Sequence, residues 1–96
     1  MAKPTRVVDR KILFIEQAFE EYNQWAIKDM EAFKKIASMI KEIRRTPFSG
    51  IGKPEALKYD LKGFWSRRIT GGDRLVYSVT DEHVYIISCK YHYGDK

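Results

Sequence analysis

The chain has 96 residues, of which 44% are hydrophobic and 14% aromatic, so it can bury the core of one small domain and is not a disordered chain. Its net charge is +5, and residues 41–74 account for all of it, with nine basic and four acidic side chains. A basic centre of this kind is typical of a surface that meets a polyanion. The single cysteine excludes an internal disulfide, and no apolar run resembles a membrane span or a signal-peptide core. We therefore expect a cytoplasmic protein without a membrane partner.

The first segment is polar and contains Pro4, so we expect residues 1–10 to form a flexible arm ahead of a single domain over residues 11–93. Residues 94–96 are expected to form a short tail. Residues 11–15 are apolar on both faces, which predicts a short strand that lies away from the sheet edge.

Two amphipathic helices are predicted next. Residues 16–28 and the segment from Met30 to Ile43 each carry an apolar stripe at helical spacing. Asp29 is placed to cap the second helix, and Thr46 followed by a proline ends it. Because the connection is so short, the helices should be antiparallel and lie together on the sheet.

Glycines and a proline predict a long loop over residues 48–62. Long loops in small domains are often functional, and this one carries Lys53, Glu55 and Lys58. A glutamate beside basic residues can equally be a surface ion pair of little energetic value, and spacing alone favours that simpler interpretation.

Residues 63–80 read as a β-hairpin with Gly71, Gly72 and Asp73 at its tip. We expect Ile69 to lie opposite Leu75, because this register keeps Trp65 and the other apolar residues on one face. Arg68 and Arg74 then project together from the polar face. Adjacent like charges are unfavourable unless an anion lies between them, although two solvated surface arginines are the simpler alternative.

The last predicted strand spans residues 83–93 and is apolar on both faces for much of its length, which indicates a central strand. The alternation does not fix the face of His92, because the preceding loop length is ambiguous and a bulge is possible.

The reactive side chains exclude several kinds of chemistry. Cys89 and His92 are the only close pair of potential zinc ligands, and their spacing fits no common zinc site. The sequence has neither a nucleophile elbow nor a nucleotide-binding glycine loop. What remains is a carboxylate, an imidazole and several arginines on a basic surface, a set that permits RNA cleavage without a metal or other cofactor.

Four segments carry a specific resemblance. Residues 46–58, 63–70, 74–77 and 89–93 strongly resemble the YoeB toxins of the RelE superfamily. This resemblance implies an α+β fold with two N-terminal helices packed on one face of a twisted, mainly antiparallel, four-stranded sheet. It also implies the toxin of a toxin–antitoxin pair, an endoribonuclease that cleaves mRNA in the ribosomal A site and so inhibits translation.

The same resemblance implies roles for individual residues. The catalytic set would be a general base, a transition-state cation and a general acid, at Glu55, Arg74 and His92 respectively. Substrate-binding roles would fall on Arg68, Lys58, Tyr93 and, more weakly, Lys53. The implied partners are a YefM-like antitoxin and the ribosome with its mRNA, and a homodimer with a second copy is a further option. The alternatives are a non-catalytic ParE-like toxin and a basic RNA-binding module.

Overall fold

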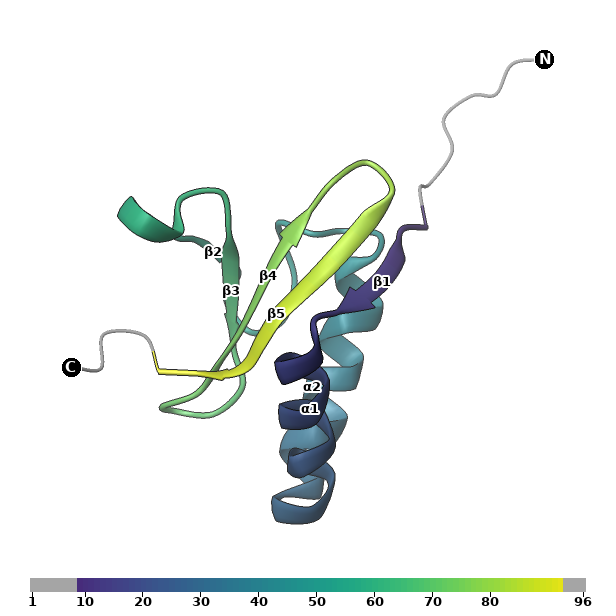
Figure 1. Ribbon diagram of the computed structural model, residues 1–96, viewed down its shortest axis with the longest axis vertical. Helices are drawn as coiled ribbons and strands as arrows, with labels where there is room; N and C mark the ends of the chain where they lie inside the picture. Colours follow the sequence, from purple (N-terminus) through teal and green to yellow (C-terminus); the bar gives the residue numbers. More distant parts are fainter. Residues whose placement is uncertain (1–8, 93–96) are drawn as a thin grey trace.

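The computed structural model describes residues 9–92, which form an α+β fold with one five-stranded sheet in the order β1-β5-β4-β3-β2 (Figure 1). Its elements are, in chain order, β1 (Lys11–Phe14), α1 (Glu16–Lys28), α2 (Met30–Ile43), β2 (Glu55–Ala56), the short 3-10 helix η1 (Tyr59–Leu61), β3 (Trp65–Arg68), β4 (Arg74–Val79) and β5 (His83–Tyr91). The pairs β2–β3, β3–β4 and β4–β5 are antiparallel, whereas β1 and β5 are parallel.

The two helices occupy the predicted residues. Asp29 caps α2 as expected, because its Oδ1 accepts a hydrogen bond from the Ala32 N–H at 3.1 Å. The helices contact each other, and α1 also contacts β5. One core cluster joins buried residues of both helices with residues of the sheet, among them Trp25, Ile36, Ile43, Leu75, Tyr77 and Ile86. Between residues 9 and 92, neither helix is long and apolar enough to cross a membrane.

Strand β1 corrects one prediction, because it lies at an edge of the sheet and not inside it. Ile12 and Phe14 pack against the core, while Leu13 on the other face is 43% exposed and pairs with Tyr85. The apolar outer face of β1 is therefore explained by contact with the single neighbouring strand β5, and it does not indicate an interior strand. Arg10, which we assigned to the flexible arm, donates from Nε to the Thr80 carbonyl oxygen at 2.7 Å. Residues 1–8 and the predicted tail lie outside the described residues.

Strand β5 is central, as predicted, but β1 accompanies only its first half. The Ile15 N–H still donates to the Ile86 carbonyl oxygen, at 3.1 Å, and the chain then turns into α1. Beyond that point, side chains of α1 form hydrogen bonds with the backbone of β5 at Cys89. The Cys89 N–H donates to Glu21 Oε1 at 2.8 Å, and the Trp25 indole N–H donates to the Cys89 carbonyl oxygen at 2.7 Å. Two side chains thus replace a missing strand.

The predicted structureless loop contains a fifth strand, which is why the sheet has one strand more than expected. In β2, Glu55 pairs with Ser66 and Ala56 pairs with Trp65 of β3. A two-residue strand with two exposed side chains has no alternating apolar pattern, so periodicity gives no signal for it.

The hairpin register differs by two residues from the prediction. Arg68 lies opposite Arg74, and Arg67 lies opposite Leu75, so five residues form the connection instead of three. Inside this connection, the Ile69 N–H donates to the Asp73 carbonyl oxygen at 2.9 Å. Because a shift of two preserves the face of every side chain, the prediction that Arg68 and Arg74 share a face is confirmed.

Candidate functional site

Three polar side chains from β2, β3 and β4 meet on one face of the sheet. Arg74 Nη1 lies 3.4 Å from Glu55 Oε1 and 3.4 Å from Ser66 Oγ. The Ser66 side chain is fully buried, and the Arg74 side chain is 16% exposed, whereas that of Glu55 is 48% exposed. The guanidinium is therefore held against the sheet, while the carboxylate is accessible to a substrate. A half-exposed pair of this kind is weak, so it can separate around an anion at small cost.

Arg68 and Tyr91 extend this polar row on either side of Arg74. Arg68 is exposed and lies opposite Arg74 in β3, and Tyr91 lies opposite it in β5. Two guanidinium groups on adjacent strands repel each other, and a bound phosphate removes that repulsion by accepting hydrogen bonds from both. The row is therefore suited to an anionic substrate.

His92 follows β5 and lies at the tip of the β3–β4 hairpin. Its Nε2 is 3.2 Å from Asp73 Oδ1, and its side chain is 50% exposed. Asp73 precedes Arg74 directly, so the hairpin brings the imidazole to the end of the strand that carries the arginine. The face that His92 occupies depends on two register shifts between β4 and β5, one on each side of Val76. The sequence pattern could not locate these shifts.

The remaining predicted site residues are less tightly placed. Lys53 and Lys58 are exposed, and neither side chain forms an ion pair or hydrogen bond within residues 9–92. Lys53 adopts a positive φ of 52°, which is uncommon outside glycine, and Lys58 immediately precedes η1. Both lie on the segment that carries Glu55. Tyr93 lies outside the described residues, so its role stays a prediction.

The structure places two further residues, Asp73 and Ser66, beside the predicted site residues. Asp73 was interpreted only as a turn residue, and Ser66 was not considered for the site. Their closeness to His92 and Arg74 follows from the strand registers, which single-strand alternation does not provide. The basic surface is also smaller than the charge count suggested. Arg44 and Arg45 lie 3.4 and 3.9 Å from Asp9, and Arg67 is fully buried.

Comparison with known proteins decides the family. A family model described as the YoeB-like toxin of bacterial type II toxin–antitoxin systems matches residues 14–93. The chain belongs to this family. It is 52% identical over 83 residues to the toxin YoeB of Escherichia coli K12, a match that covers 86% of this chain and 99% of the relative.

Solved YoeB structures agree with this assignment. A YoeB dimer from Staphylococcus aureus superposes with a TM-score of 0.81 at 48% identity, covering 90% of this chain and 100% of that one. A heterotetrameric YoeB–YefM complex from the same organism has a TM-score of 0.78 at 49% identity, covering 88% of this chain and 98% of that one. The protein is thus a YoeB-family toxin of a type II toxin–antitoxin system.

Proposed function

We propose that this toxin is a ribosome-dependent endoribonuclease that cleaves mRNA in the A site and thereby inhibits translation. The observation that carries the proposal is the Glu55–Arg74 contact of 3.4 Å, with Arg68 opposite Arg74 and His92 at the adjoining hairpin tip. A carboxylate, two guanidinium groups and an imidazole are the groups that acid–base cleavage of RNA requires.

The cleavage is a transfer within the RNA. Glu55 takes the proton of a ribose 2′-hydroxyl, and the oxygen attacks the neighbouring phosphorus as the bond to the 5′-oxygen breaks. His92 gives its proton to the departing 5′-oxygen. The products are a 2′,3′-cyclic phosphate and a free 5′-hydroxyl, so no outside reactant is needed. Arg74 and Arg68 stabilise the negative charge that develops on the phosphate oxygens.

Asp73 gives His92 a defined orientation in this scheme. With Nε2 directed at the Asp73 carboxylate, 3.2 Å away, Nδ1 is the nitrogen that can donate toward the substrate. The exposed Lys53 and Lys58 flank Glu55 and are suited to contact the RNA backbone, which would make binding dependent on salt.

We also propose that a YefM-like antitoxin binds and silences this toxin, and that the toxin can form a homodimer. The support is the 49% identity to the YoeB of a YoeB–YefM heterotetramer and the 48% identity to the YoeB of a dimer, both from Staphylococcus aureus.

The test is an in vitro translation reaction in which mRNA ends are mapped by primer extension. His92→Gln should lower cleavage by about 10²–10⁴-fold, the usual range for a general acid. His83→Gln is the matched control, because His83 lies at the opposite end of β5 and stacks on Tyr85 with ring centroids 5.5 Å apart. Cuts that require ribosomes and disappear only in the first variant support the proposal. Blocked translation without cuts would support a non-catalytic ParE-like toxin or a basic RNA-binding module instead.

A further inference from the structure

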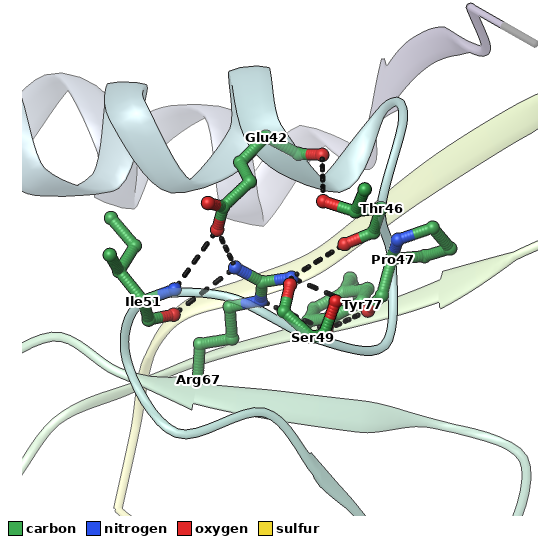
Figure 2. Close-up of polar contacts among 7 residues, drawn as sticks. All are labelled: Glu42, Thr46, Pro47, Ser49, Ile51, Arg67 and Tyr77. Carbon is green, nitrogen blue, oxygen red and sulfur yellow. Dashed lines mark hydrogen bonds and ion pairs between the residues drawn. The ribbon is translucent and has the colours of Figure 1, made fainter. Parts of the chain in front are cut away.

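Arg67 is a charged side chain in the interior of the protein, and no step of the proposed reaction uses it. It is fully buried on the helix-facing side of β3 (Figure 2). Its guanidinium lies between Glu42 of α2 and the segment of residues 46–51, which leads from α2 toward β2. A buried guanidinium is costly unless each of its N–H groups finds an acceptor.

All five N–H donors of Arg67 have acceptors. Nε donates to the Tyr77 hydroxyl at 3.2 Å, and Nη1 donates to Glu42 and to the Ile51 carbonyl oxygen, the latter at 3.1 Å. Nη2 donates to the carbonyl oxygens of Thr46 and Ser49, at 3.0 and 2.9 Å. Nη2 also makes a longer contact of 3.5 Å with the Pro47 carbonyl oxygen, so a single side chain binds four carbonyl groups of one loop and connects them to α2 and β4.

Tyr77 and Glu42 extend this network to the same loop. The Tyr77 hydroxyl donates to the Pro47 carbonyl oxygen at 2.7 Å, and burial raises the pKa of Tyr77, which keeps that donor protonated. The Ile51 N–H donates to Glu42 Oε1 at 3.0 Å. Residues 46–51 thus contact the Arg67 network through four carbonyl groups and one N–H group.

Two glycines allow the loop to approach so closely. Gly50 has a φ of +126°, and a Cβ there would collide with the Glu42 carboxylate. Gly52 has a φ of +84°, and a Cβ there would lie 2.7 Å from Met39 Sδ. The Gly52 carbonyl oxygen then accepts the Arg68 N–H at 2.7 Å, so the loop is attached to β3 three residues before Glu55.

We propose that Arg67 is a positioning residue for Glu55. It fixes residues 46–52 against α2 and β3, so that β2 pairs with β3 at Ser66 and the Glu55 carboxylate meets Arg74. This inference rests on the proposed function, since it concerns how the general base is held. Arg67 touches neither the substrate nor the reacting atoms, and its effect on cleavage passes through Glu55.

Arg67→Lys keeps the charge but supplies three donors in place of five. We expect the single-turnover rate on ribosome–mRNA complexes to fall by about 10²-fold, the scale of a misplacement of roughly 1 Å. The toxin concentration at half-maximal rate should change little, because Arg68 and Arg74 lie on β3 and β4 and keep their places. Where Arg67→Lys does not fold, Glu42→Gln removes only the counter-charge and should give a smaller loss of the same kind.

The decisive comparison is a double-mutant cycle. In a Glu55→Gln background, Arg67→Lys should cost no further activity, because the group that it positions is already lost. Val84→Ala is the control for lost stability, since Val84 is fully buried where β5 pairs with Ile12 of β1 and takes part in none of the hydrogen bonds of the Arg67 network. Its effect on activity should be small and the same with either residue at position 55.

Amide hydrogen exchange gives a readout that needs no activity. Arg67→Lys should speed exchange at Ile51 and Arg68, whose N–H groups donate within this network, and Val84→Ala should not do so selectively. If the protein without substitutions does not cleave mRNA, the proposed function is wrong. Failure of this inference appears as cleavage that Glu55→Gln abolishes but Arg67→Lys leaves intact, or as an Arg67→Lys loss that persists in full without Glu55.

Discussion

Replacing Trp25 with phenylalanine tests whether side chains of α1 truly serve as a strand partner for β5. Trp25 is 3% exposed, and its indole N–H donates to the Cys89 carbonyl oxygen at 2.7 Å. Trp25→Phe leaves that buried carbonyl without this donor, which costs roughly 1–3 kcal/mol. The smaller ring also removes buried apolar atoms worth about 1–2 kcal/mol at ~0.8 kcal/mol per methylene.

We therefore expect Trp25→Phe to lower the free energy of unfolding by about 2–5 kcal/mol. For a domain of this size, 3 kcal/mol corresponds to a fall in Tm of roughly 12–24 °C. Urea unfolding followed by far-UV circular dichroism measures the change without relying on tryptophan fluorescence. The midpoint should shift while the slope stays constant.

Trp65→Phe is the matched control. Trp65 is half-buried and packs on Phe48 with ring centroids 4.7 Å apart, and its indole N–H donates to none of the residues that the structure describes. This variant loses the same atoms without leaving a carbonyl unpaired, so it should cost no more than about 1–2 kcal/mol. Equal losses in the two variants would refute the reasoning, because the cost would then come from ring size alone.

Two further predictions concern charge and titration. Arg74→Gln should lower the cleavage rate by on the order of 10²–10³-fold, because in the proposed reaction Arg74 stabilises charge on the phosphate; Arg45→Gln, which alters an exposed residue 3.9 Å from Asp9, should not. An Arg74→Gln effect on RNA binding alone would show that Arg74 only positions the substrate. Burial, and then the charge of Glu21, raises the pKa of Cys89 from 9.0 to about 12. The unfolded chain therefore loses this proton first, and stability that is complete below pH 9 should decline as the pH rises from 9 toward 12. Cys89→Ala should flatten the decline between about pH 9 and 10, below the raised pKa values of Tyr22 and Tyr77, and an unchanged slope in urea unfolding would contradict this.

The helices and the faces of the hairpin could be predicted from the sequence because both depend on local periodicity. Apolar residues at helical spacing, together with the Asp29 cap, locate α1 and α2. Alternation placed Arg68 and Arg74 on one face even though the register was wrong by two residues, since faces repeat with a period of two.

The features that periodicity missed depend on contacts between distant segments. Strand β2 exists because Glu55 and Ala56 find β3, and His92 lies beside Asp73 because of register shifts in β4. Arg67 belongs to the apolar face by alternation, yet its burial depends on carbonyl groups that lie 16 to 21 residues earlier. No local rule distinguishes such an arginine from a solvated one.

The parallel pairing of β1 with β5 places Lys11 opposite His83, so the first strand can pair only after the last strand has been synthesised. The same delay applies to α1, whose Glu21 and Trp25 find their backbone partners only at Cys89. Contacts this remote in sequence give a high contact order, which slows folding. A nascent chain in which β5 has not yet been synthesised cannot complete its core, because Val84, Ile86 and Cys89 belong to that core. Such a chain also lacks His92. With His92 as the proposed general acid, folding and cleavage activity are therefore expected to arise together, after translation has passed residue 92.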